Sequence, residues 1–96
     1  MSQDSIPSFA FPEGVMTREV EGELVLLNLR SEQYYGLDSV GADVVTRLTR
    51  QSLGQALDGL CQRYEVDVEV LRADVEHLVQ ELLQAGLLER SEIRPS

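Results

Sequence analysis

The fold is decided by residues 22–37, which read Gly-Glu-Leu-Val-Leu-Leu-Asn-Leu-Arg-Ser-Glu-Gln-Tyr-Tyr-Gly-Leu. Leucine and valine dominate the first part of this stretch, and two tyrosines and a leucine follow in residues 33–37. These residue types favour strands, and Arg30-Ser31-Glu32 between the two arms has turn character. The stretch therefore predicts a β-hairpin, and the rest of the chain is expected to cover it.

The register of this hairpin stays open on the residues alone. Pairing Leu27 with Tyr35 places Tyr35 and Leu37 on the same face as Leu27, whereas pairing Leu29 with Tyr34 exchanges the two tyrosines. Because side chains alternate between the faces of a strand, a slip of one residue decides which tyrosine belongs to the core.

A further strand is expected before the hairpin, and helices are expected after it. Residues 15–20 contain β-branched side chains and lead into Glu21-Gly22, which suits a turn. After Leu37 the apolar spacing changes to that of a helix, which Asp38 or Ser39 can cap and which ends near residue 50.

Two more helices have explicit ends. Ser52-x-x-Gln55 predicts a capping box at the start of the second helix. Asp67 is the expected N-cap of the third helix, which carries a wide apolar stripe. Gly86 suits the left-handed position after that helix, and Leu87 can fold back on it as in a Schellman motif.

The predicted fold is α+β, with a three-stranded antiparallel sheet followed by three helices on one side of it, in a winged-helix-like arrangement. At 96 residues the chain has room for one domain with one modest core. We expect a flexible N-terminal segment at residues 1–12, a single domain at 13–89 and a C-terminal tail at 90–96.

Composition limits the partners and the compartment. The net charge of -9 disfavours nucleic acid and anionic membranes as partners. No apolar run approaches the roughly 20 residues of a membrane span. Residues 1–5 lack the features of a signal peptide, and the single cysteine, Cys61, cannot form an internal disulfide, so we expect a cytoplasmic protein.

No residue pattern in the chain predicts catalysis, a metal site or a cofactor. Cys61 lies on the apolar stripe of the second helix, where a small buried side chain is the ordinary interpretation. His77 is the only histidine and is expected to be solvated. One cysteine and one histidine do not make a zinc site, and the scattered glycines form no phosphate-binding loop.

A winged-helix-like order of elements also raises the alternative of a DNA-binding transcription regulator. Residues 68–85 contain one arginine, one histidine and four carboxylates. A helix that contacts phosphates carries several basic residues, so the charge disfavours this alternative.

The second arm of the hairpin, residues 33–37, is the strongest candidate for a binding site. It has none of the charged residues or prolines that normally protect a sheet edge. Such an edge can accept a peptide as an additional strand. The alternative is that residues 13–20 pair with this edge and close it.

Six segments resemble the PqqD family in their order and spacing over residues 22–89. They are Leu26-Leu27-Asn28, Tyr34-Tyr35-Gly36-Leu37, Val40-Gly41-Ala42, Tyr64-Glu65-Val66-Asp67, Asp74-Val75 and Leu82-Leu83-Gln84-Ala85-Gly86-Leu87-Leu88. The resemblance implies a non-catalytic protein that recognises the leader of a ribosomally made precursor peptide. In that family the leader binds as a fourth strand of the sheet, against the third helix.

Carried onto this sequence, the resemblance implies a peptide-binding site on the second hairpin arm and the third helix. The residues are Glu32, Gln33, Tyr34, Tyr35, Gly36, Leu37, Leu71, Asp74, Val75 and Leu78. The implied partners are the precursor leader and a leader-cleaving protease or another modifying enzyme. The length resembles the stand-alone recognition proteins, and we favour the type found with lasso peptides.

Overall fold

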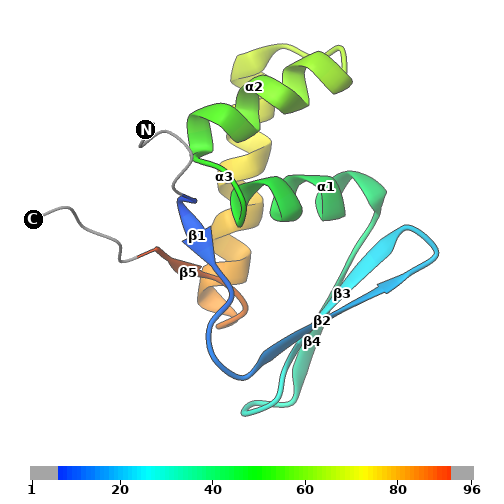
Figure 1. Ribbon diagram of the computed structural model, residues 1–96, viewed down its shortest axis with the longest axis vertical. Coiled ribbons are helices and arrows are strands. Elements are labelled where there is room, and N and C mark those ends of the chain that lie inside the picture. Colours follow the sequence, from blue (N-terminus) through cyan, green and yellow to red (C-terminus); the bar gives the residue numbers. More distant parts are fainter. Residues whose placement is uncertain (1–6, 92–96) are drawn as a thin grey trace, which may run out of the picture.

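The computed structural model describes residues 7–91, and its main sheet precedes its helices along the chain (Figure 1). The elements are β1 (Phe9–Ala10), β2 (Val15–Val20), β3 (Glu23–Asn28), β4 (Gln33–Leu37), α1 (Ser39–Leu48), α2 (Leu53–Arg63), α3 (Val68–Gln84) and β5 (Glu89–Arg90). Strands β2, β3 and β4 form an antiparallel sheet in that order. The three helices lie on one side of it (Figure 1). The predicted α+β fold with a three-stranded antiparallel sheet and three helices is confirmed.

The first hairpin is closed by the expected turn. Glu21 and Gly22 both have positive φ angles, 53° and 84°. Two consecutive residues of this kind form the tight turn whose twist matches the twist of the flanking strands. This turn fixes the pairing of Val20 with Glu23 and hence the register of β2 against β3.

The register of the second hairpin differs from both alternatives considered for it. Leu27 pairs with Tyr34, and Leu26 pairs with Tyr35. Directly paired residues share a face, so Tyr35 lies on the face of Leu26, which is completely buried. Tyr34 lies on the opposite face with 74% of its surface exposed.

Asn28 is the reason for this register. Its side-chain Oδ1 accepts hydrogen bonds from the backbone N–H groups of Arg30 (2.9 Å) and Ser31 (3.2 Å). An asparagine that bonds the backbone two residues further on forms a turn of its own. The strand therefore ends at Asn28, and Leu29, expected in the strand, falls in the loop with 53% of its surface exposed.

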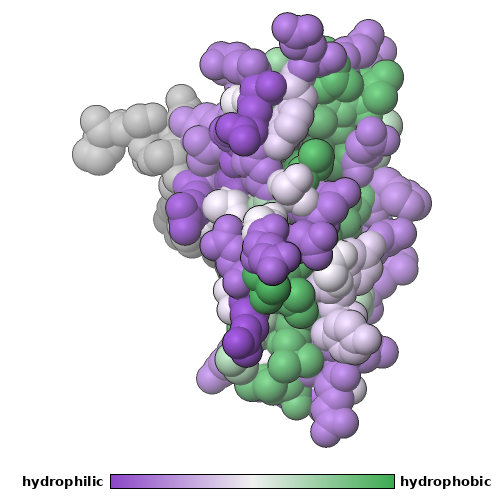
Figure 2. Space-filling view, turned by 90° about the vertical axis from the view of Figure 1, so that its right-hand side faces the viewer, coloured by the Kyte–Doolittle hydropathy of each residue, from purple (hydrophilic) through white to green (hydrophobic). Residues whose placement is uncertain are grey.

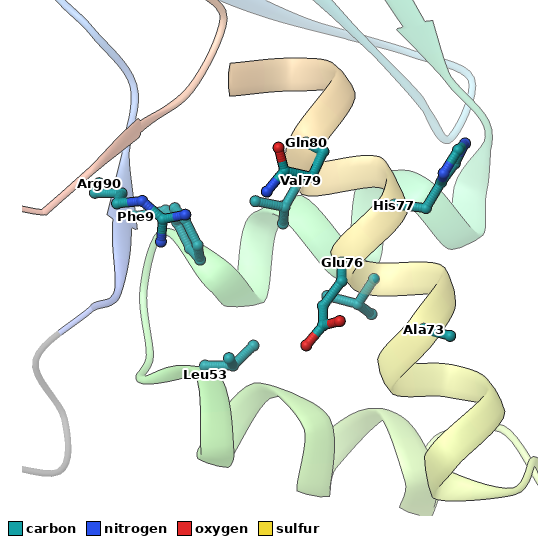
Figure 3. Close-up of a pocket in the computed structure, with 9 residues that line it drawn as sticks. Phe9, Leu53, Ala73, Glu76, His77, Val79, Gln80 and Arg90 are labelled. Carbon is teal, nitrogen blue, oxygen red and sulfur yellow. The ribbon is translucent and has the colours of Figure 1, made fainter. Parts of the chain in front are cut away.

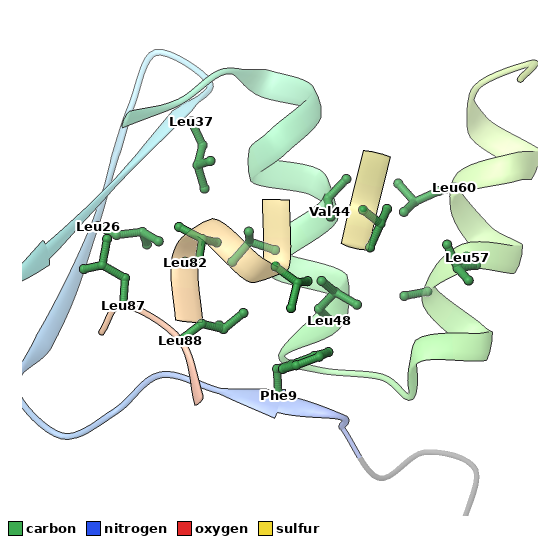
Figure 4. Packing of buried hydrophobic residues seen from close by; sticks show 14 of the residues in the cluster. Phe9, Leu26, Leu37, Val44, Leu48, Leu57, Leu60, Leu82, Leu87 and Leu88 are labelled. Carbon is green, nitrogen blue, oxygen red and sulfur yellow. The ribbon is translucent and has the colours of Figure 1, made fainter. Parts of the chain in front are cut away.

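One hydrophobic core joins the sheet to the helices. Figure 4 shows Leu26 and Leu37 of the sheet pointing toward Leu82 of α3. Helix α1 contributes Val44, Val45 and Leu48, and α2 contributes Ala56, Leu57 and Leu60, all of them buried. These positions repeat with the period of a helix, as expected for helices that bury one stripe.

Side chains cap the helices at the predicted residues. The Asp38 side chain accepts a hydrogen bond from the N–H of Gly41 (2.8 Å), and the Asp67 side chain accepts one from Glu69 (2.8 Å). Ser52 and Gln55 form the predicted capping box. These contacts satisfy backbone donors at the helix starts that otherwise lack partners.

The end of α3 is the predicted Schellman motif. Gly86 has a φ angle of 73°, and the backbone N–H groups of Gly86 and Leu87 donate to the carbonyls of Leu83 and Leu82. The motif turns Leu87 back into the core, where it is 1% exposed. The Asn28 side chain also donates to the Gly86 carbonyl (3.1 Å), so the hairpin loop is attached to the end of α3.

Strands β1 and β5 were not predicted. Phe9 pairs with Arg90 and Ala10 with Glu89, and the Phe9 ring is buried in the core. Polar Glu89 and Arg90 give no strand signal of their own, because their place in a strand depends on a partner about eighty residues away. Residues 1–6 and 92–96, which include most of the expected terminal segments, lie outside the described part. None of the helices that the structure describes has the length and hydropathy of a membrane span.

Replacing Gly86 by alanine is expected to lower the free energy of unfolding by about 1 to 2 kcal/mol, the cost of a left-handed backbone with a Cβ. The added Cβ would also lie 3.1 Å from the Asn28 Nδ2 atom. Urea unfolding of Gly86→Ala measures the change.

Gly54→Ala is the matched control for that experiment. Gly54 lies in α2, and a Cβ there meets no atom within 4 Å. We expect this variant to be more stable than the parent chain by up to about 1 kcal/mol. Equal stability of the Gly86→Ala variant and the parent chain would contradict the assigned role of Gly86.

Candidate functional site

The outer edge of β4 is open. Strand β4 is the last strand of the sheet, and no strand within residues 7–91 pairs with its outer side. Val15–Val20 pairs with β3, so the alternative in which residues 13–20 close this edge is wrong. The five residues of β4 include no lysine and no proline, and their unpaired backbone groups are available to a further strand.

Helix α3 provides the second side of the site. The Tyr35 hydroxyl donates a hydrogen bond of 2.5 Å to the Glu81 carboxylate, which connects β4 to α3. Residues 32–35 line a hollow of about 420 Å³ together with Ala85 and Leu87, just after α3. We call this region, formed by β4 with Glu81, Ala85 and Leu87, the β4–α3 groove.

The groove continues along one face of α3. Asp74, Leu78, Glu81 and Ala85 are separated by four, three and four residues, the spacing of side chains on one side of a helix. Because Glu81 and Ala85 face β4, Leu78 and Asp74 lie on the same side of α3 and extend the wall of the groove. Leu78 is half-buried and Asp74 is exposed, so both present surface to a bound chain.

Leu71 and Val75 adjoin this row, three residues before Asp74 and three before Leu78, on the side of the helix that packs into the core. They are 7% and 3% exposed and belong to the buried stripe that packs into the core. Their side chains therefore lie beneath the helix surface, whereas Asp74 and Leu78 lie on it.

The structure divides the predicted β4 residues between two faces and an edge. Tyr35 and Leu37 point toward the helices, and Leu37 is buried against them. Tyr34 and Gly36 lie on the other face. Glu32 precedes the strand and has a φ angle of 62°, which places it in the loop at one end of the groove.

The groove wall is acidic. The second carboxylate oxygen of Glu81 lies 3.2 Å from His77 Nε2, one helical turn away, and Asp74 is exposed on the same wall. Glu32 adds a carboxylate at the loop end. Backbone groups, an apolar side chain at Leu78 and these carboxylates suit an extended peptide with apolar and basic side chains.

Glu81 also sets the protonation of Tyr35. The pKa of the Tyr35 phenol is raised, first because it donates its hydrogen bond to Glu81, and then through burial and the nearby negative charge. Each of these effects favours the neutral phenol. A phenol is already neutral at physiological pH, and the raised pKa keeps Tyr35 a hydrogen-bond donor into more alkaline solution.

A second hollow, of about 480 Å³, lies on another face of α3, beside β1, β5 and the start of α2 (Figure 3). Phe9, Leu53 and Val79 contribute apolar side chains to it, and Arg90 lies over the Phe9 ring at 5.7 Å. Within residues 7–91 there is no group of three histidine, cysteine or acidic residues arranged to hold a metal ion. The open sheet edge remains the better defined candidate.

Glu81, Ala85 and Leu87 were missed as site residues. Periodicity does not show how a helix is rotated toward a strand edge, so the sequence pattern gave Glu81 no role in the site. The spacing of Glu81 from Leu78 on the helix was the signal that could have identified it. Ala85 and Leu87 were assigned only to the end of α3.

Comparisons with known proteins find a matching family model and similar solved structures. The family model described as coenzyme PQQ synthesis protein D (PqqD) matches residues 23–88. The solved structure of TbiB1 in complex with the TbiA(beta) leader peptide is 29% identical, with a TM-score of 0.76 over 83% of this chain and 94% of that chain. A lasso peptide synthetase B1 complexed with the leader peptide is 26% identical, with a TM-score of 0.79 over 85% and 98% of the two chains. No curated protein matches the sequence.

Glu81→Gln is expected to lower the pKa of Tyr35, because the amide removes the negative charge and accepts a weaker hydrogen bond. The neutral Tyr35 phenol stabilises the folded chain, and this contribution to the free energy of unfolding is complete below about pH 10, the pKa of an unfolded tyrosine. It is lost as the pH rises through the higher pKa of the folded chain. Ultraviolet titration of tyrosinate measures the shift, and Tyr35→Phe identifies which step belongs to Tyr35. Identical titration curves for Glu81→Gln and the parent chain would contradict this assignment.

Proposed function

The chain belongs to the PqqD family, and on this premise we propose that it recognises the leader region of a ribosomally made precursor peptide. The leader binds by strand addition at β4, and the chain presents it to a processing enzyme. The similarity to a lasso peptide synthetase B1 supports a role in lasso peptide biosynthesis.

The observation that carries this proposal is the open edge of β4 beside α3. Backbone groups along β4 supply affinity that is independent of side chains, and the α3 wall supplies selectivity. Both similar structures hold a leader peptide, which supports the same kind of ligand here.

The proposed contacts divide into an edge and a wall. Residues 32–37 form the edge that receives the leader, with Tyr35 facing α3. Asp74 and Leu78 form the wall together with Glu81. The buried Leu71 and Val75 support that wall from beneath. Alternate side chains of the leader point toward the wall, because side chains alternate along an added strand.

The proposed role is binding without catalysis, and the chemistry belongs to the enzyme that receives the complex. For the lasso type, that enzyme is a leader-cleaving protease. The proposed peptide-binding domain comprises residues 13–89, and Phe9 of β1 packs into its core from outside these bounds. We place this step in the cytoplasm, where a precursor is made and a free thiol such as Cys61 remains reduced.

Strand addition can be tested by removing backbone N–H donors from the leader peptide, while the protein is left unchanged. A series of leader peptides, each N-methylated at one position, is titrated by fluorescence anisotropy. In an antiparallel pair only every second residue bonds the neighbouring strand. We expect methylation to weaken binding at alternate positions, by roughly 2- to 10-fold each, the loss of one hydrogen bond.

The unmethylated leader is the reference, with an expected dissociation constant on the order of micromolar to tens of nanomolar. A scrambled leader controls for nonspecific binding. Equal losses at consecutive positions, or no loss at any position, would exclude strand addition. Mass spectrometry of the precursor after incubation with this chain alone is expected to show an unchanged peptide.

Leu78→Ala is expected to weaken leader binding by roughly 5- to 30-fold, because it removes about 1 to 2 kcal/mol of apolar contact from the α3 wall. Leu83→Ala is the matched control, since Leu83 is also half-buried on α3 but lies outside the row of Asp74, Leu78 and Glu81. We expect Leu83→Ala to lower stability while leaving the affinity of the folded chain unchanged. Equal affinities of the two variants would argue against Leu78 as a contact.

A further inference from the structure

The sheet has a second face, which is turned away from the helices. In the middle of this face Met16, Leu27 and Tyr34 form one row across the three strands. Arg18, Val25 and Gly36 form the next row. Val20 and Glu23 complete the face at the first turn. We call these eight residues the outer sheet face.

The outer sheet face is apolar and exposed. Met16 is 54% exposed, Val20 is 46% exposed and Tyr34 is 74% exposed. Figure 2 shows hydrophobic residues reaching the surface in the lower part of the molecule, where the sheet lies. The solvent side of an antiparallel sheet normally alternates to polar residues, and an exposed apolar patch marks an interaction surface.

Gly36 makes this face unusually accessible on β4. Gly36 does not have a positive φ angle, and a Cβ at this position would meet no atom within 4 Å. Neither the backbone nor the packing of this chain therefore requires a glycine here. A glycine within a strand often marks a place where another chain approaches closely.

Resting on the proposed function, we propose that the outer sheet face docks the leader-cleaving protease while β4 holds the leader. The protease surface that fits is apolar, with a carboxylate opposite Arg18. Arg18 lies between Met16 and Val20 and opposite Val25, with Glu23 diagonal to it, and it forms no ion pair within residues 7–91. A cation in such a position selects a partner by its charge.

The charges disfavour a second copy of this chain as the occupant. A symmetric pair presents the same patch from both sides, so within the outer sheet face the only carboxylate it offers to Arg18 is Glu23 of the other copy. Two chains of net charge -9 also repel each other. A different protein with a complementary carboxylate has neither disadvantage.

The outer sheet face is continuous with the β4 edge. This continuity favours the enzyme that acts on the leader as the protein that docks on the face. Tyr34 and Gly36 belong both to β4 and to the outer sheet face. A leader added beside β4 extends this face by one strand and places alternate side chains on it. An enzyme docked there contacts the recognition protein and the bound leader together.

The test uses the full chain and a purified leader-cleaving protease from the organism that encodes this chain. Met16→Glu and Arg18→Glu are each expected to weaken protease binding about tenfold or more, as for residues near the centre of an interface. Both are expected to leave leader affinity within about twofold, because neither residue lies on β4 or α3. Calorimetry measures protease binding, and anisotropy measures leader binding.

Val68→Glu is the matched control, because Val68 is 46% exposed at the start of α3, away from the sheet. It should bind the protease as the parent chain does. Thermal melts establish that each variant is folded, and Arg18→Glu provides the test if Met16→Glu is not.

The possible failures are distinguishable. A parent chain that does not bind the leader overturns the proposed function. A parent chain that binds the leader, with folded variants that bind the protease as well as it does, overturns only the docking surface. Sedimentation showing a dimer that Met16→Glu dissociates would overturn it in favour of a second copy.

Discussion

The side chain of Asn28 is the contact on which the arrangement of the site depends. It accepts two backbone hydrogen bonds that close the β3–β4 loop, and it donates one to the carbonyl of Gly86. The first two bonds end β3 and set the register of β4. The third attaches this loop to the end of α3. One amide group therefore determines both which residues of β4 face the helices and where the helix ends relative to the strand.

The β4–α3 groove follows from these bonds. With the register fixed, Tyr35 faces α3 and bonds Glu81, while Tyr34 is left on the opposite face. Gly86 reverses the chain at the end of α3, and the buried Leu87 holds that end against the sheet. The groove is bounded by secondary structure on both sides, so its two walls are held in place before a ligand arrives. Preorganisation of this kind lowers the cost of binding.

Local signals in the sequence predicted most of the fold, and contacts between distant residues account for the differences. Asp38, Ser52, Asp67 and Gly86 act within a few residues of their own positions, and the structure places each as predicted. The hairpin register was not predictable, because alternating apolar residues tolerate a slip of one residue and the role of the Asn28 side chain is not visible in periodicity. Strands β1 and β5 pair across most of the length of the chain, and neither has a strand signal of its own.

The same distinction applies to the candidate site. The edge strand was predictable from residues 33–37 themselves, and the family resemblance indicated the helix beside it. Of the four residues of α3 expected in the helix wall, Asp74 and Leu78 reach the surface beside Glu81, whereas Leu71 and Val75 are buried. The rotation of α3 is set by packing against α2 and the sheet, which periodicity alone does not specify.

The alternation of β4 also bears on how the two proposed interactions affect each other. Tyr35 faces the β4–α3 groove and Tyr34 faces the outer sheet face, so consecutive residues of one short strand belong to two surfaces. In the proposed complex, a leader paired with β4 enlarges the outer sheet face by one strand. If the protease contacts the enlarged face, each ligand must raise the affinity for the other by the same factor, because coupling free energies are reciprocal. Through strand addition, the protease would bind the protein that carries a leader more tightly than the empty protein. This preference requires no conformational change in the domain.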